Sequence, residues 1–287
     1  TGLRCGYTFG RVLIRDSPYN TMTEKQMELL IEQSIFSILY RDKNKNEIRH
    51  VGTGVVVCKK GIFITAGHTF RQKGDFKLED FRACFIVNGN IYITPIKEIC
   101  WDSIDFSKQK VPEFKDYAVG QLLNPIRVRS TYKRLYIKRY IYLKIRKKQP
   151  LNLEKLYLYA YEYKDPKTED RSLGDNFDNI DIDKIHLMHS QLLVIKNEIV
   201  IPPDKAFNNC SSLRGKAEAT NSGAPMFDEN MLIRGVLLGG ITGIQGKDAD
   251  CKFVNMCRSK YYANRIKDYN TAKRKCKNYQ IISGNGK

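Results

Sequence analysis

The chain has 287 residues, of which 42% are hydrophobic and 28% are charged, and its mean hydropathy is -0.45. This length and composition can bury one large core or two ordinary ones, which excludes an intrinsically disordered protein. No apolar run approaches the roughly 18 residues of a membrane-spanning helix, so we expect no transmembrane segment. Lys and Arg outnumber Asp and Glu by 49 to 31, and the net charge of +18 favours an anionic partner.

The eight cysteines do not form a recognisable metal site. Their spacing contains no C-x-x-C pair, and no histidines complete a zinc set, so we predict neither a metal nor a cofactor. Two interpretations remain open for these cysteines, namely buried free thiols or a few disulfides in a secreted protein. The sequence starts at Thr1 without a signal-peptide pattern, which is typical of a processed or trimmed chain.

The first predicted element is a helix over residues 21–33. Thr21, with Glu24 three positions later, matches a capping box, and Met27, Leu30 and Ile31 follow at helical spacing. From Ser34 onward the pattern changes to short, β-branched runs separated by turns, which predicts antiparallel β structure. These runs cover residues 34–42, 50–58, 61–68, 83–89, 90–99, 117–123, 155–163, 191–201, 231–241 and 251–257. A second helix is expected over residues 258–268.

Charge is concentrated in two segments. The stretch from Arg127 to Lys148 holds ten basic residues and no acidic one, with tyrosines interleaved. It is either a solvated crossing between two halves of the protein or a binding surface for an anionic polymer or membrane surface. Residues 162–183 carry eight acidic and three basic residues, and we expect them to form a long exposed loop.

Three short segments hold residues suited to nucleophilic catalysis. A β-branched run delivers His68 into a turn of small residues, Asp116 directly precedes an apolar run, and Ser222 lies in a tight turn before another. Each segment alone has an ordinary structural explanation, such as a core histidine, a strand-entry aspartate or a simple turn. Their order and their positions at strand edges give them a joint interpretation.

The order His68, Asp116, Ser222 resembles that of the chymotrypsin-like serine proteases, whose motifs read roughly T-A-A-H, D-I-A-L and G-D-S-G-G-P. The resemblance spans nearly the whole chain. It implies an all-β fold of two packed antiparallel β-barrels, with a short N-terminal helix and a C-terminal helix. Residues 1–133 would form the first barrel, with the histidine and the aspartate, and residues 134–287 the second, with the serine and the specificity pocket.

The resemblance also implies a serine endopeptidase that cleaves protein or peptide substrates through an acyl-enzyme. Ser222 would be the nucleophile, His68 the general base and then acid, and Asp116 the carboxylate that orients the imidazole. The backbone N–H groups of Thr220 and Ser222 would form the oxyanion hole. The substrate-binding positions would be Lys216, Leu238, Gly239 and Gly240.

Several positions depart from the family pattern. Thr220 replaces a glycine whose conformation a β-branched residue disfavours, which leaves open a catalytically weak or inactive homologue that acts as a binding module through its basic stretch. Asn221 replaces the aspartate that pairs with a newly cut N-terminus in the trypsin branch, so activation of that kind is not expected. Lys216 is either a pocket residue that favours an acidic side chain before the scissile bond or an exposed loop lysine.

The cysteine pattern bears on where the protein acts. Thr69 stands where secreted animal relatives have a cysteine, so that family disulfide is missing, while Cys210 and Cys251 remain candidates for another. We predict a secreted protein with disulfide bonds, and the alternative is an intracellular or viral-polyprotein setting.

Overall fold

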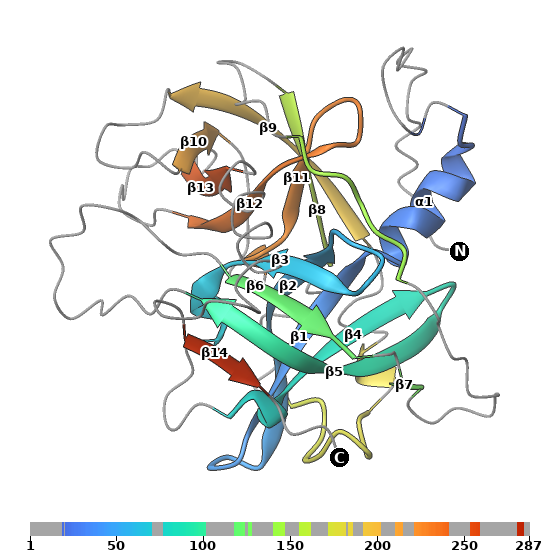
Figure 1. Cartoon of the computed structure of the whole chain (residues 1–287), viewed down its shortest axis with the longest axis vertical. Coiled ribbons are helices and arrows are strands. Elements are labelled where there is room, and N and C mark those ends of the chain that lie inside the picture. Colours follow the sequence, from blue (N-terminus) through green and yellow to red (C-terminus); the bar gives the residue numbers. More distant parts are fainter. Residues whose placement is uncertain are drawn as a thin grey trace, which may run out of the picture.

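The computed structural model describes residues 19, 21–70, 77–101, 118–123, 126–127, 140–146, 155–161, 172–181, 183–185, 192–201, 210–214, 221–240, 253–258 and 280–283. Figure 1 shows the strands in two groups, one above the other, with a single labelled helix beside them. Among these residues, no helix is long and apolar enough to cross a membrane.

The predicted N-terminal helix is confirmed as α1, Glu24–Glu32. Its cap is Thr23 rather than the expected Thr21: the Thr23 hydroxyl accepts the N–H of Gln26 at 3.2 Å, and the Gln26 side chain accepts the N–H of Thr23 at 2.8 Å. The N–H of Met22 donates to the carbonyl of Tyr19 at 2.9 Å, and the helix begins after this hydrogen bond. Leu30 and Ile31 bury the inner face of the helix.

The first group of strands closes into an antiparallel ring. Around the ring, each strand pairs with the next in the order β1, β2, β3, β6, β5, β4, and β4 returns to β1. These strands are β1 Ile35–Asp42, β2 Glu47–Val56, β3 Ile62–Thr65, β4 Phe81–Val87, β5 Asn90–Trp101 and β6 Ala118–Leu122. Two further strands, β7 Ile126–Arg127 and β14 Gln280–Ser283, also pair with β5. Short 3-10 helices, η1 Gly67–Phe70 and η2 Leu78–Asp80, lie between β3 and β4.

Aromatic rings fill the interior of this first barrel. The rings of Phe36 and Phe63 meet edge to face with centroids 5.3 Å apart, and Phe85 packs on Phe36 at 5.1 Å. A Cβ on Gly54 would overlap the ring of Phe36, so this glycine makes room for the core. The first five residues of β1 are all buried, because this interior covers one face of the strand and neighbouring apolar clusters cover the other.

The second group of strands forms a closed barrel in the order β10, β13, β12, β11, β8, β9. The strands are β8 Lys155–Tyr161, β9 Leu192–Ile201, β10 Cys210–Arg214, β11 Pro225–Phe227, β12 Ile233–Gly240 and β13 Phe253–Arg258. The expected all-β fold of two antiparallel barrels is therefore confirmed. Arg258 ends β13, and the rest of the expected C-terminal helix, 259–268, lies outside the described residues.

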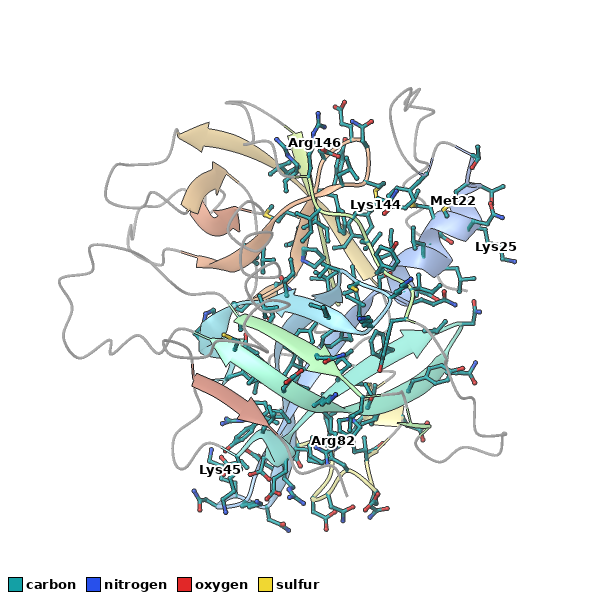
Figure 2. The ribbon with its side chains drawn as sticks, in the orientation of Figure 1. Met22, Lys25, Lys45, Arg82, Lys144 and Arg146 are labelled. Carbon is teal, nitrogen blue, oxygen red and sulfur yellow. The ribbon has the colours of Figure 1, made fainter. Side chains whose placement is uncertain are left out.

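A segment between the barrels, residues 140–146, bonds to both of them. The N–H of Leu143 donates to the carbonyl of Val56 in β2, and the N–H of Ile233 in β12 donates to the carbonyl of Lys144. Leu143 also belongs to an apolar cluster that joins residues of both barrels, among them Ile35, Val55, Ile64, Phe227, Ile233 and Val236. Lys144 and Arg146 belong to this segment, near the C-terminal end of the basic stretch, and are labelled in the upper part of Figure 2. The boundary at residue 133 stays a prediction.

The described part of the acidic segment is not the exposed loop that its composition predicts. Leu173 and Phe177 are buried against the first barrel, and the N–H of Leu173 donates to the carbonyl of Ile48 at 2.7 Å. The guanidinium of Arg82 lies 4.6 Å from the centroid of the Phe177 ring. The apolar residues of the acidic segment therefore anchor it to the first barrel, while its described acidic residues remain exposed.

The described cysteine side chains are free thiols. Cys58, Cys84 and Cys100 form no disulfide, and burial raises the pKa of Cys84 to about 12. Cys251, one half of the expected Cys210–Cys251 pair, lies outside the described residues, and the backbone register places Cys210 opposite Cys257. The predicted disulfide therefore has no support among the residues that the structure describes.

Candidate active site

His68 follows directly from the end of β3. This strand ends at Thr65, and in η1 His68 lies between the buried residues Gly67 and Thr69. The Thr65 hydroxyl donates to the carbonyl of Thr53 in β2 at 2.6 Å, which fixes the start of this turn. The backbone around His68 is therefore held by the first barrel, while His68 itself is only partly buried.

Ser222 lies in a tight turn directly before β11. The N–H of Ala224 donates to the carbonyl of Asn221 at 2.9 Å, and the N–H of Gly223 donates to the carbonyl of Leu237 in β12 at 2.7 Å. Gly223 has a φ of +88°, a backbone region that favours glycine. The conformation of the turn therefore requires a glycine directly after Ser222. Ser222 itself is only 5% exposed.

The structure brings the Ser222 turn against the segment that carries His68. The N–H of Thr53 donates to the carbonyl of Ser222 at 2.8 Å, across the two barrels. A Cβ on Gly52 would lie 2.9 Å from the Ser222 carbonyl oxygen and 2.8 Å from Oγ1 of Thr69. Gly52 therefore lies between the nucleophile candidate and the residue next to His68.

Asp116 lies outside the described residues, as do Thr220 and Lys216. The two residues that end the Asp116 motif are described: Ala118 pairs with Thr65, and the next residue of β6 pairs with Ile64. The end of this motif therefore lies beside the strand that leads to His68.

The expected substrate-binding strand lies next to the Ser222 turn. Leu238, Gly239 and Gly240 end β12, and the register with β13 shifts between Leu237 and Gly239. Because Leu237 accepts the N–H of Gly223, the strand and the turn are joined directly.

Thr69, which stands where the resemblance would place a cysteine, makes a close contact with β2. Thr69 is buried, and its side chain packs on Gly52, where any Cβ would lie 2.7 Å from Cγ2 of Thr69. A glycine and a threonine thus fill the space between β2 and η1.

His50 is a buried residue that the sequence analysis did not single out. Ile48 and His50 are both buried, whereas Glu47, Arg49 and Val51 are only partly buried. This alternation along β2 predicts that His50 faces the interior. Its Nε2 donates to the carbonyl of Gly52 at 2.6 Å, and burial lowers its pKa to about 4. A neutral imidazole therefore supports the backbone next to Thr53, the residue that bonds to Ser222.

Within the described residues, no group of three His, Cys, Asp or Glu side chains lies close enough to hold a metal ion.

Comparison with known proteins identifies the fold. No protein-family model matches the chain, and no curated protein matches its sequence. Among solved structures, the chain is similar to the scabies mite inactivated protease paralogue S-D1, with a TM-score of 0.56 and 14% identity over 85% of this chain and 95% of that one. It is also similar to neuropsin, a serine protease expressed in the limbic system of mouse brain, with a TM-score of 0.53 and 12% identity over 84% and 96% of the two chains. The chain therefore has the two-barrel fold of the chymotrypsin-like serine proteases, at low sequence identity.

Proposed function

We propose that the protein is a serine endopeptidase with Ser222 as nucleophile, His68 as general base and Asp116 as orienting carboxylate. The observation that carries the proposal is the contact between the two barrels. The N–H of Thr53 binds the carbonyl of Ser222 at 2.8 Å, and Gly52 lies between that carbonyl and the neighbour of His68. This contact joins the two barrels close to both candidate residues, which supports a catalytic pair formed between the barrels.

Each residue has a defined part in the proposed reaction. His68 takes the proton of the Ser222 hydroxyl as the oxygen attacks the scissile carbonyl, and then gives it to the leaving amine. Asp116 holds the imidazole in the correct tautomer. The N–H groups of Ser222 and Thr220 stabilise the oxyanion, each of them by about 3 kcal/mol. Water then hydrolyses the acyl-enzyme.

The proposed substrate is a peptide that runs along the end of β12. Leu238, Gly239 and Gly240 provide backbone groups there, and the glycines leave space for a large side chain. Lys216 would favour an acidic side chain before the scissile bond, because a buried ammonium requires an opposite charge.

A library of fluorogenic peptides tests the activity. We expect hydrolysis by the intact protein and a loss of four or more orders of magnitude in Ser222→Ala and in His68→Ala. His189→Ala serves as the matched control, because His189 lies in none of the three segments that carry the candidate residues, and it should retain activity. If the intact protein cleaves no peptide, the alternative of a non-catalytic binding module replaces this proposal.

The same library tests the specificity. Cleavage after Asp or Glu that is lost in Lys216→Gln would support the role of Lys216, and cleavage only after Arg or Lys would exclude it.

A further inference from the structure

A basic cavity of about 220 Å³ lies on the first barrel, apart from the candidate active site. Lys59 and Lys60 contribute from the turn between β2 and β3, and Lys97 contributes from β5. The remaining wall consists of Gln121, Leu122, Leu123 and Tyr140. Three exposed lysines thus line one small cavity whose remaining wall is partly apolar.

The backbone of the lysine turn is held in place by three consecutive carbonyl groups. The carbonyl of Lys59 accepts the N–H of Tyr140 at 3.2 Å, and that of Gly61 accepts the N–H of Leu122 at 3.0 Å. Between them, the carbonyl of Lys60 accepts Nε2 of Gln121 at 3.0 Å. The turn is therefore held by β6 and by the segment of residues 140–146. A backbone that is already ordered lowers the entropy cost of binding a ligand.

Tyr140 and Gly61 complete this arrangement. Gly61 has a φ of +77°, and a Cβ there would lie 2.7 Å from Cε2 of Tyr140, so the ring packs directly on the turn. Tyr140 is only 6% exposed. The buried ring of Tyr140, from the segment of residues 140–146, therefore forms one wall of the cavity.

Lys97 reaches the cavity from an irregularity in β5. The register between β5 and β6 shifts between Ile96 and Glu98, so Lys97 is an extra residue in this ladder. Such a bulge redirects a side chain relative to the regular alternation. It brings the third lysine to the turn that carries the other two.

The charge of the cavity is uncompensated in the part of the chain that the structure describes. Other basic side chains there pair with acids, for example Lys43 with Asp80 at 2.9 Å and Arg146 with Asp228 at 2.8 Å. Lys59, Lys60 and Lys97 form no such ion pair with a described residue, and no described Asp or Glu lines the cavity. Three lysines around one small cavity, with no described acid among its lining residues, favour the binding of a compact, multiply charged anion.

We propose that this cavity binds a phosphate group, either as the free ion or as a small monoester. Lysines bind phosphate through charge-assisted hydrogen bonds, and each of the three can donate one to a phosphate oxygen. The leucines and the tyrosine would contact the organic part of a monoester. The volume fits a ligand of that size and not a folded partner.

The cavity and the candidate active site lie at opposite ends of one strand pair. Ile62 of β3 pairs with Gln121 at the cavity, and Thr65 pairs with Ala118 at the end that leads to His68. The phosphate site is therefore distinct from the peptide site, and its test is independent of protease activity.

Titration calorimetry with inorganic phosphate and with phenyl phosphate, at constant ionic strength, tests the proposal. We expect both to bind the intact protein, and binding to weaken at least tenfold in the triple variant Lys59→Gln, Lys60→Gln, Lys97→Gln. The matched control removes three other exposed lysines, by Lys25→Gln, Lys77→Gln and Lys144→Gln, and should bind like the intact protein. Lys25 and Lys144 are labelled in Figure 2.

The measured affinities distinguish binding of the free ion from binding of a monoester, and they show whether the cavity binds phosphate at all. Tighter binding of phenyl phosphate would assign a monoester, and equal binding would assign the free ion. Absent binding to the intact protein, or equal weakening in both triple variants, would overturn the proposal. The single variant Lys97→Gln, at an exposed position, gives the same test should the triple variant not fold.

Discussion

The backbone N–H of Thr53 donates a hydrogen bond to the carbonyl oxygen of Ser222, with a length of 2.8 Å. Thr53 belongs to the first barrel and Ser222 to the turn before β11 of the second. This bond joins the two barrels at the nucleophile candidate itself. The position of Ser222 therefore depends on the residues that pack around Thr53.

The turn after Ser222 should tolerate only glycine. Gly223→Ala would place a Cβ at a φ of +88°, in overlap with the Thr53 carbonyl and the Thr65 hydroxyl. We expect a loss of more than about 3 kcal/mol in the free energy of unfolding, measured by urea denaturation. Gly89→Ala is the matched control, since Gly89 also has a positive φ, of +72°, but open space around it. It should lose only about 1 kcal/mol, and equal losses in the two variants would contradict the packing described for Gly223.

A disulfide should form between positions 52 and 69 when both residues are cysteine. A Cβ on Gly52 lies within 2.8 Å of both outer atoms of the Thr69 side chain, which is close enough for a bridge. We expect Gly52→Cys, Thr69→Cys to oxidise in air, and the oxidised form to have a free energy of unfolding about 3 kcal/mol above that of the reduced form. The reduced form of the same variant is the reference, because the new Cβ at position 52 meets the Ser222 carbonyl in both forms. Mass spectrometry under non-reducing conditions checks the bond. Two free thiols after oxidation would show that β2 and η1 are further apart than described.

The carboxylate of Asp228 should be important for the stability of the second barrel. It lies 2.8 Å from Nη1 of Arg146 and 3.9 Å from Nε of Arg234, and it accepts the N–H groups of Asn230 and Leu232. Because Arg234 is 2% exposed, removing this negative charge leaves a cation in a poorly solvated position. Asp228→Asn keeps the acceptor oxygen and should lose about 3 kcal/mol in the free energy of unfolding.

The control for this variant is the neighbouring acid. Glu229 is exposed, and Glu229→Gln should change the free energy of unfolding by less than about 0.5 kcal/mol. A loss of the same size in both variants would mean that net charge, rather than the buried contact, explains the effect.

Stability should fall in mild acid because of His50. Its pKa is about 4 in the fold against 6.5 for an exposed histidine, so the unfolded chain binds more protons between these pH values. The contribution of the neutral imidazole is fully present above pH 6.5 and is lost as the pH falls towards 4. His50→Gln keeps an N–H donor for Gly52 and cannot gain this proton. Urea denaturation between pH 7 and pH 4 should show that the free energy of unfolding falls by about 3 kcal/mol more in the intact protein than in the variant. If the free energy of unfolding depends on pH in the same way in both proteins, the role assigned to His50 is wrong.

The sequence predicted the local features that depend on neighbouring residues. The β-branched runs predicted most strands of both barrels but not β10 of the second. The small-residue turns around His68 and Ser222 predicted strand edges at these positions, and the structure has them at the end of β3 and before β11. The helix was also predicted, but Thr21 and Thr23 both precede an acid or amide by three residues, and the sequence does not show which of them is the cap.

The sequence did not predict features that depend on distant packing. Strand β14 has four residues and pairs with β5 far earlier in the chain, so no local pattern reveals it. The acidic segment was predicted to be exposed from its charge, although Leu173 and Phe177 bury it against the first barrel. The lysine cavity joins the β2–β3 turn, β5, β6 and Tyr140, which are separated in sequence. The roles of Asp116, Thr220 and Lys216 remain predictions.

Labelling with a fluorophosphonate tests the central claim most directly, because this reagent reacts with a serine only when an adjacent base has activated it. The intact protein should be labelled at a single peptide that contains Ser222, and the label should disappear in Ser222→Ala and in His68→Ala. Labelling should persist in His189→Ala. A folded, intact protein that takes up no label, or one labelled at another serine, would contradict the account.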